Sequence, residues 1–250
     1  MTAKGPFLFE IRLEALEDST SRQAYNDLYS ETSLSQIESF YIWNLRQIDA
    51  PPGATLLDVS CGAGEFVHLA AQHGYRASGV DISETIARTA ARRTRGLAPI
   101  SVGAGETLPF ADASFDVVTS IGSLEHYLDP GQGAYEMARV LKPGGRAYIL
   151  VPNTFSLLSN VWNAYRKGLT SVDDQPLQRY GARLDWTILL EQNGFKVTRT
   201  LKYERPWPYH RPDWGHYLRK PKELLRMIAG PFVPLNLAFC FVFVCQRAQA

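Results

Sequence analysis

The stretch LLDVSCGAGEF at positions 56–66 decides the fold of this chain. The apolar residues 55–59 predict a buried strand, the glycines predict a tight turn, and residues 65–73 have helical periodicity. A strand that runs into a glycine-rich turn and then a helix lets a ligand approach the backbone at the carboxyl end of the strand. The simpler alternative is that Gly62 and Gly64 only form the turn.

The chain repeats this alternation of strand and helix. Six further strands are expected, at 76–80, 100–102, 115–120, 146–151, 195–201 and 239–246. Alternation with amphipathic helices favours a parallel sheet with right-handed crossovers. The last two strands follow the final helix and are expected to close the sheet as an antiparallel pair. The predicted fold class is α/β, with a seven-stranded, mostly parallel, doubly wound sheet.

Two flanking segments are expected around this core, within one structural domain. Residues 1–53 carry apolar side chains at helical spacing and predict an N-terminal helical cap. Residues 54–153 form the ligand-binding core, and residues 154–250 are expected to cover a bound substrate and to supply the last strands. Three prolines within 203–217 predict that this part has no regular structure.

The composition argues against several classes of protein. The 250 residues carry 26 Lys and Arg against 25 Asp and Glu, a net charge of +1, so nucleic acid is not expected as a partner. Cys61, Cys240 and Cys245 are too few and too scattered for a disulfide framework or a zinc site, and no metal is expected. The first residues lack the apolar core of a signal peptide, so the expected location is the cytoplasm.

An acidic residue at the end of the second strand indicates the kind of ligand. A carboxylate at Asp81 can accept hydrogen bonds from two ribose hydroxyls, which together with the turn favours a nucleoside. Val67 stands where a dinucleotide-binding turn has glycine or alanine, and its side chain would crowd the packing of helix on strand. A nicotinamide-dependent oxidoreductase is therefore disfavoured.

These residues resemble a known family. Residues 58–64, DVSCGAG, are similar to motif I of the class I S-adenosylmethionine-dependent methyltransferases, in their small-molecule branch. Matches to later motifs of that family follow in the same order, at 80–83, 103–110, 115–126 and 141–145. The resemblance covers residues 54–153, and more loosely the strands after 185. It implies a Rossmann-like fold and S-adenosyl-L-methionine as cofactor, with S-adenosyl-L-homocysteine as product.

The resemblance also implies which residues bind the cofactor. The turn would lie against the methionine and ribose, Asp81 would bind the ribose hydroxyls, Ile82 would pack on the adenine, and the Gly105 N–H would face the adenine ring. The implied cofactor-binding residues are Asp58, Ser60, Cys61, Gly62, Gly64, Asp81, Ile82, Gly105, Glu106, Ser120 and Ile121.

The chain departs from the family pattern at two positions. Ser60 replaces the usual first glycine of motif I, which is tolerable only if its φ is negative. Ala104 stands where the family often has an aspartate that accepts a hydrogen bond from the adenine amino group. That hydrogen bond must be lost or supplied elsewhere.

The implied reaction moves a methyl group to an oxygen, nitrogen or carbon atom of a small-molecule acceptor, a biosynthetic intermediate. A sulfonium is an activated donor, so in-line displacement needs alignment more than fixed acid or base groups. The candidate bases are His126, His210 and His216, and a loop or surface histidine is the alternative for each. Walls of the acceptor site are expected from aromatic residues, which in the alternative only pack on the core: Tyr25, Tyr29, Trp207, Tyr209 and Trp214.

Three questions stay open. The interleaved basic and apolar residues of 218–227 are typical of a helix on an anionic membrane or, more often, of a helix with a solvated charged face, which we favour. The oligomeric state is not determined by the sequence. Two alternative functions are a catalytically silent protein that binds S-adenosylmethionine and a methyltransferase that acts on a macromolecule. The low net charge and the sequence SIGS at 120–123 speak against a macromolecular amino group as acceptor.

Overall fold

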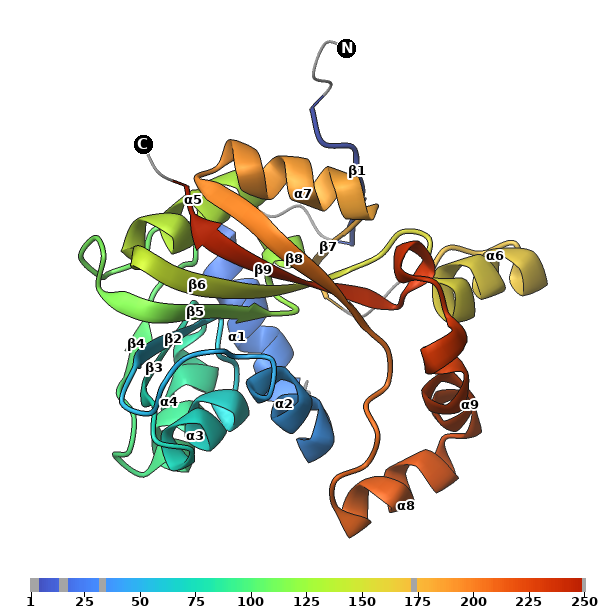
Figure 1. Cartoon of the computed structure of the whole chain (residues 1–250), viewed down its shortest axis with the longest axis horizontal. Helices are drawn as coiled ribbons and strands as arrows, with labels where there is room; N and C mark the ends of the chain where they lie inside the picture. Colours follow the sequence, from blue (N-terminus) through green and yellow to red (C-terminus); the bar gives the residue numbers. More distant parts are fainter. Residues whose placement is uncertain (1–4, 14–17, 32–34, 172–174, 249–250) are drawn as a thin grey trace.

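A seven-stranded sheet forms the centre of the computed structural model, which describes residues 5–13, 18–31, 35–171 and 175–248 (Figure 1). The strand order is β4-β3-β2-β5-β6-β9-β8. These strands are β2 (Thr55–Val59), β3 (Arg76–Asp81), β4 (Ile100–Val102), β5 (Phe115–Ile121), β6 (Leu141–Pro152), β8 (Phe195–Tyr203) and β9 (Cys240–Arg247). The seven strands and their mostly parallel pairing confirm the predicted fold class.

The strand order places a switch point between β2 and β5. From β2 the chain moves outward through β3 to β4, and it then returns to β5 on the other side of β2. All pairs from β4 to β6 are parallel, and β9 runs antiparallel to both β6 and β8. Crossovers that diverge from such a point leave a crevice at the carboxyl ends of the strands. The antiparallel final pair is confirmed.

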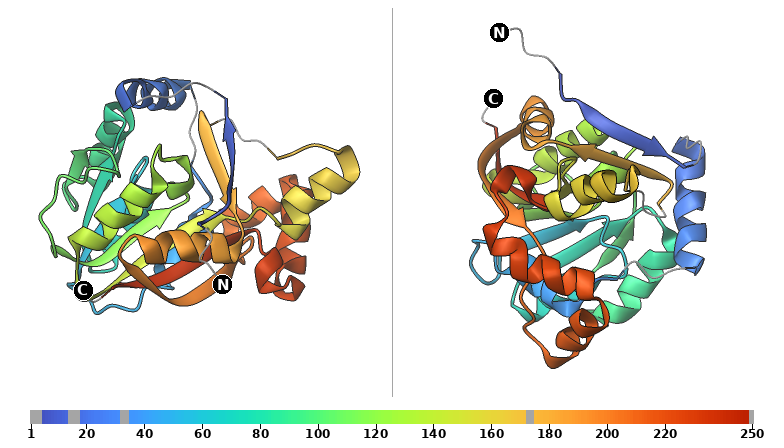
Figure 2. Two further views of the ribbon diagram at one scale, coloured as in Figure 1. Left: turned by 90° about the horizontal axis from the view of Figure 1, so that it is seen from above. Right: turned by 90° about the vertical axis from the view of Figure 1, so that its right-hand side faces the viewer.

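Helices cover both faces of the sheet because neighbouring strand residues point to opposite sides. Leu56 belongs to the core under α2 (Glu38–Leu45), α3 (Glu65–Gln72) and α4 (Glu84–Thr94). Leu57 belongs to the core under α5 (Pro130–Val140) and α7 (Arg183–Gln192), which contains the fully buried Trp186. Figure 2 shows these layers from two sides.

Some elements differ from the expectation. The cap contains the helix α1 (Asp18–Glu31), but it begins with a strand, β1 (Leu8–Arg12), that pairs antiparallel with β7 (Leu177–Gly181). The prediction that 203–217 has no regular structure is wrong, because α8 (Arg211–Arg219) begins there. Pro212 lies in the first turn of that helix, where no backbone donor is needed.

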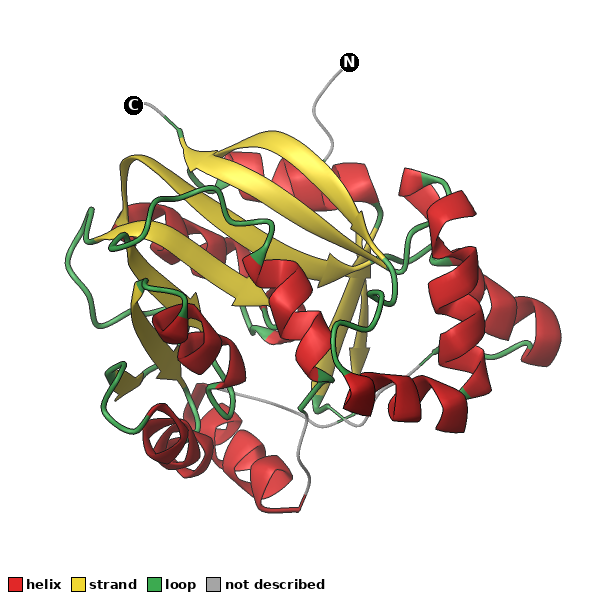
Figure 3. Cartoon of the chain, turned by 60° about the horizontal axis from the view of Figure 1, so that its bottom comes forward, coloured by secondary structure: helices red, strands yellow, loops and turns green. Residues whose placement is uncertain are grey.

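A group of helices stands apart from the sheet layers, at the right of Figure 3. Two separate segments of the chain form this group. Its members are η2 (Leu157–Val161), α6 (Trp162–Lys167), α8, α9 (Pro221–Ala229) and η3 (Gly230–Phe232). The short helix η4 (Leu235–Leu237) then leads into β9. We call η2, α6, α8, α9 and η3 the arm. No helix within the described residues is long and apolar enough to cross a membrane.

A buried arginine joins the two-stranded sheet of β1 and β7 to the loop that follows β5. Arg179 of β7 donates hydrogen bonds to the carbonyl oxygens of Tyr127 and Leu128, just after the short helix η1 (Leu124–His126), and it pairs with Glu10 of β1 at 2.7 Å. The Arg179 side chain is buried and the Glu10 carboxylate is partly exposed. β1, β7 and η1 are therefore fixed to one another by one guanidinium.

We predict that Arg179→Met lowers the free energy of unfolding by about 3 kcal/mol, because it leaves the carbonyl groups of Tyr127 and Leu128 without their donor and removes one of the two arginines that pair with Glu10. Urea unfolding measures the change. The exposed Arg199 on β8 gives the matched control, and Arg199→Met should change stability by less than about 0.5 kcal/mol. Equal effects of the two variants would contradict the structural role of Arg179.

Candidate active site

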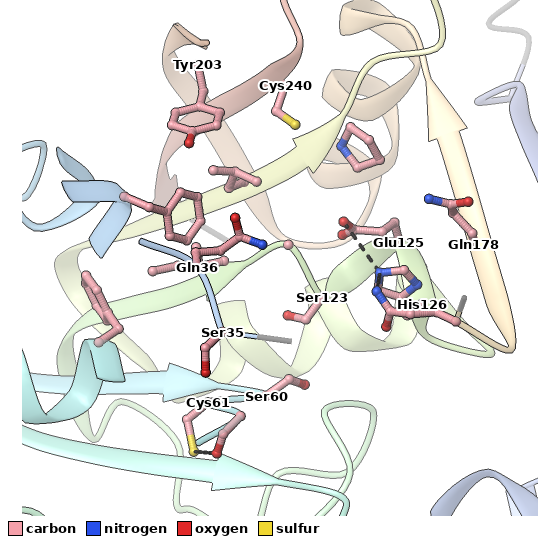
Figure 4. A pocket seen from close by; sticks show the side chains of 18 of the residues that line it. Ser35, Gln36, Ser60, Cys61, Ser123, Glu125, His126, Gln178, Tyr203 and Cys240 are labelled. Atoms are coloured by element: carbon pink, nitrogen blue, oxygen red, sulfur yellow. Dashed lines mark hydrogen bonds and ion pairs between the residues drawn. The ribbon is translucent and has the colours of Figure 1, made fainter. Parts of the chain in front are cut away.

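A cavity of about 660 Å³ opens at the carboxyl edge of the sheet. Its walls come from the turn after β2, the end of β3, the loop with η1, the strand β7, helix α1 and the start of β9. Figure 4 shows Ser60 and Cys61 on one side of this space, Tyr203 and Cys240 on the opposite side, and Glu125, His126 and Gln178 between them. Pockets of this size hold small organic ligands.

The turn after β2 has left-handed backbone at three positions. φ is +59° at Ser60, +53° at Gly62 and +78° at Gly64. The expectation of a negative φ at Ser60 is therefore wrong. A left-handed serine costs about 1–2 kcal/mol, and its hydroxyl forms a hydrogen bond with the Tyr127 hydroxyl at 2.8 Å that helps to hold this conformation.

Asp81 fixes the turn from the neighbouring strand. Its carboxylate accepts hydrogen bonds from the backbone N–H of Gly62 at 2.9 Å and from that of Ser83 at 3.0 Å. Burial raises the pKa of Asp81 to about 6, although these backbone donors oppose the shift. The carboxylate lines the cavity and has lone pairs left for further donors.

Asp58 lies at the end of β2, deep in the same wall. The Thr119 hydroxyl on β5 donates a 2.6 Å hydrogen bond to its Oδ1. Burial is the main cause that raises the pKa of Asp58 to about 7, and the Thr119 donor opposes it. Asp58 therefore holds a proton at a pH where an exposed aspartate has lost it.

Tyr127 closes the wall between the turn and the loop at 103–110. A Cβ on Gly105 would lie 2.2 Å from the Tyr127 hydroxyl oxygen, and one on Gly133 would lie 2.3 Å from the Tyr127 ring. The packing of Tyr127 therefore requires glycine at position 105, independently of the expected contact of Gly105 with adenine. The neighbouring Glu106 carboxylate accepts a 3.0 Å hydrogen bond from the Leu128 N–H.

Most of the expected cofactor-binding residues line the cavity. They are Asp58, Ser60, Cys61, Gly62, Asp81, Ile82, Gly105, Glu106 and Ile121. The cavity wall does not include Gly64 or Ser120. Gly64 packs against Ala90 of α4, and the Ser120 hydroxyl pairs with that of Ser123 at 2.8 Å. Ser123 lines the cavity instead of Ser120, and it is not among the predicted site residues.

Helix α1 covers the end of the cavity next to Asp81. Tyr25 and Tyr29 both line the cavity, and the Tyr25 hydroxyl donates a 3.4 Å hydrogen bond to the His126 carbonyl oxygen, so Tyr25 also reaches the polar end. Their roles toward an acceptor stay predictions. Asn26 holds the helix in place, because its Oδ1 accepts a 2.6 Å hydrogen bond from the Ser83 hydroxyl. Burial, with the nearby Asp81 carboxylate, raises the pKa of Tyr29.

The other end of the cavity contains polar side chains from distant parts of the chain. Of the three candidate histidines only His126 lines it; its Nδ1 lies 2.5 Å from the Leu177 carbonyl, and its Nε2 lies 2.8 Å from Gln175 and 3.8 Å from Glu125. Glu125 lies within the match at 115–126, next to His126, but is not among the site residues that the sequence predicts. Tyr203, which begins the aromatic segment 203–217, also lines the cavity, and so do Asn153, Gln178 and Cys240, which no local motif in the sequence indicates.

The remaining expected residues lie outside the cavity wall. His216 is 2.9 Å from Glu223 Oε2, and His210 is half exposed beside Glu38. Trp207 and Trp214 pack edge to face with ring centres 5.6 Å apart, and the Arg46 guanidinium lies 4.2 Å from the centre of the Tyr209 ring. Roles of these five residues toward an acceptor stay predictions.

Comparison with known proteins identifies the family. A family model described as a methyltransferase domain matches residues 57–149. The chain is 34% identical over 168 residues to the demethylmenaquinone methyltransferase of Chlorobaculum parvum, which covers 60% of this chain and 69% of that protein. The chain belongs to the class I S-adenosylmethionine-dependent methyltransferases.

Two further comparisons define how far the likeness reaches. The ubiquinone/menaquinone biosynthesis C-methyltransferase of Geotalea daltonii is 34% identical over 131 residues, 48% of this chain and 56% of the relative. Several curated relatives are matched over only about half of their length. A solved methyltransferase of Thermotoga maritima, described as a possible histamine N-methyltransferase, superposes with a TM-score of 0.64 at 19% identity, covering 90% and 99% of the two chains. That likeness shows the shared fold.

The hydrogen-bonding groups of this cavity fit the family's cofactor. A Cβ on Gly62 would meet nothing within 4 Å, so the turn leaves open space beside its backbone. The Asp81 carboxylate faces that space and suits a pair of hydroxyl donors. No group of three metal-ligating side chains forms among the residues that the structure describes.

The raised pKa of Asp58 makes the stability of the fold depend on pH. Between about pH 4 and pH 7 the folded protein holds a proton that the unfolded chain has released, so the free energy of unfolding falls as the pH rises through this window. We predict that Asp58→Asn, which keeps an acceptor for Thr119, is more stable than wild type by about 4 kcal/mol at pH 8 and equal to it near pH 4. Urea unfolding over this pH range measures both, and parallel profiles would contradict the prediction.

Proposed function

We propose that this protein transfers a methyl group from S-adenosylmethionine to an oxygen, nitrogen or carbon atom of a small-molecule acceptor. One observation carries the proposal. A single cavity is lined both by Gly62 and Asp81, which we expect to bind the nucleoside, and by Glu125 and His126 at the polar end. A cofactor and an acceptor can therefore be aligned inside one cavity.

The residues of the turn and of β3 would hold the cofactor. Asp81 would accept from the ribose hydroxyls, Asp58 would support the methionine end, and the backbone from Ser60 to Gly62 would lie along both. Bound S-adenosylmethionine supplies an electrophilic methyl group on a sulfonium. The chain's own task is to align an acceptor with that group and to exclude water.

The acceptor end favours a ring that carries hydroxyl groups. Phe40, Tyr203 and Phe239 offer aromatic walls, and Gln178 and Asn153 offer groups that can bind oxygen atoms. The relatives from Chlorobaculum parvum and Geotalea daltonii are named for steps on demethylmenaquinone and in ubiquinone or menaquinone biosynthesis. Hydroquinone-type compounds are therefore the acceptors to test first.

Methylation of such an acceptor also releases a proton, which needs a place to go. The new bond forms to the methyl carbon as its bond to sulfur breaks, leaving S-adenosylhomocysteine, and the acceptor loses one proton. Glu125 is buried at the cavity wall, 3.8 Å from His126. We assign the proton to the Glu125 carboxylate, with His126 as its orienting neighbour.

Calorimetric binding of S-adenosylmethionine and S-adenosylhomocysteine tests the cofactor site. We predict that Asp81→Ala weakens both at least tenfold, because it removes the ribose acceptor and the partner of Gly62 N–H. Wild-type affinity should rise from pH 5 to pH 7, since the raised pKa leaves Asp81 partly protonated below about pH 6. A well-folded wild type that binds neither compound would overturn the proposal.

Turnover distinguishes an enzyme from a silent binding protein of the same fold. With a hydroquinone acceptor that is turned over, we predict that Glu125→Gln lowers kcat about 100-fold and leaves the affinity for S-adenosylmethionine unchanged. The exposed Glu191 is the control, and Glu191→Gln should leave kcat unchanged. An unchanged kcat in Glu125→Gln would show that alignment alone carries the reaction. Cofactor binding without methylation of any compound would favour the silent protein.

A further inference from the structure

The arm exposes aromatic side chains that a folded core would normally bury. On α6, Trp162 is 53% and Tyr165 is 80% exposed, and Leu169, just after the helix, is 61% exposed. They are spaced by three and four residues, which places Trp162 and Tyr165 along one side of α6, while Leu169 lies beyond the end of the helix at Gly168. The two rings lie 6.1 Å apart, and the Arg166 guanidinium lies 5.7 Å from the Trp162 ring centre.

A second apolar stripe lies on α9 and η3. Leu225, Ile228 and Phe232 have exposed fractions of 61%, 54% and 85% and repeat at the same spacing of three and four residues. Met227 on the opposite side is buried and attaches the helix to the protein. The exposed stripe is therefore the face of an amphipathic helix that no other described part of the chain covers.

The two stripes belong to one surface. Figures 1 and 2 show α6 and α9 next to each other at the outer edge of the molecule. The Arg226 guanidinium on α9 donates a 2.9 Å hydrogen bond to the Leu158 carbonyl of η2, the helix that continues directly into α6. We call Trp162, Tyr165, Leu169, Leu225, Ile228 and Phe232 the apolar edge.

The sequence around the apolar edge carries a positive net charge. Residues 154–174 and 204–235 contain eight Lys and Arg against five Asp and Glu, a net charge of +3, whereas the whole chain has a net charge of +1. Two of these acidic residues have partners within the protein, since Asp213 accepts from Ser39 and Glu223 pairs with His216. Arg219, Lys220 and Lys222, all exposed, lie close to the second stripe in sequence. Exposed aromatics among basic side chains fit an anionic lipid surface.

The apolar edge lies directly beside the cavity. Ser156, Ser159 and Asn160, in and just before η2, line the cavity, and so does Arg226 of α9. The same two segments thus form the cavity wall on their inner side and carry the apolar edge on their outer side. A lipid surface at the apolar edge would lie next to the end of the cavity that is remote from Asp81.

We propose that the apolar edge and its basic surroundings form a surface that binds to an anionic lipid bilayer. The sequence alone favoured a solvated charged face, but α6 and α9 together expose two adjoining apolar stripes that a solvated face does not need. Single helices of this kind lie in the headgroup region with the apolar side inward. If the proposed function holds, a lipid-soluble acceptor can pass from the bilayer into the cavity.

Co-sedimentation with vesicles tests the proposal without cofactor or acceptor, so it is independent of the methyltransferase activity. We expect wild type to bind vesicles of phosphatidylglycerol and phosphatidylcholine more tightly than vesicles of phosphatidylcholine alone, and to be released by salt. The double variants Trp162→Ser/Tyr165→Ser and Leu225→Ser/Ile228→Ser should each weaken binding at least tenfold. All four side chains are exposed, so both variants should fold.

Leu97 and Leu184 are matched controls, because each is 59% exposed and lies outside the arm. Leu97→Ser/Leu184→Ser should bind vesicles like wild type. Absence of wild-type binding, or equal losses in the control, would overturn the proposal. Sedimentation velocity tests whether a second copy of the chain binds the apolar edge instead. If wild type is a dimer, both arm variants are monomers and no protein binds vesicles, the apolar edge forms contacts between copies of the chain.

Discussion

The parallel pairing of β2 with both β3 and β5 is the constraint on which the active site depends. It brings the ends of three strands to one edge, so that Asp58, Asp81 and the loop after β5 surround the same space. The hydrogen bond from Gly62 N–H to Asp81 then ties the turn after β2 to the end of β3. The two buried carboxylates are costly to ionise there, and polar donors from the turn and from Thr119 offset part of that cost.

The half of the site built by this pairing could be predicted from the sequence. Strand, turn and helix follow one another within a few residues, so local pattern and topology together determine where Asp58, Gly62 and Asp81 lie. The sequence did not determine the backbone at Ser60. Its left-handed φ depends on a hydrogen bond to Tyr127, which is 67 residues away in the chain.

The acceptor half could not be predicted in the same way, because it is assembled by contacts between segments far apart in sequence. β1 pairs with β7 across most of the chain, and Arg179 then fixes η1 against both. Neither strand has a pattern strong enough to identify it, and Gln178 enters the cavity only through that pairing. Glu125 lies within the match at 115–126, but the direction of its side chain depends on the conformation of the short helix η1. In the proline-rich segment the local pattern led to a wrong prediction, since Pro212 lies in the first turn of α8, where a proline is tolerated.

Tyr127 couples the residues that are tolerated at Ser60, Gly105 and Gly133. Its hydroxyl contacts Ser60, and its ring occupies the space that side chains at Gly105 and Gly133 would need. An alanine at either glycine is compatible with this fold only when the residue at 127 becomes smaller, and the loss of the ring would in turn release the strained turn at Ser60. Divergence at these four sites is therefore coupled, and among homologous chains they should be exchanged together or not at all.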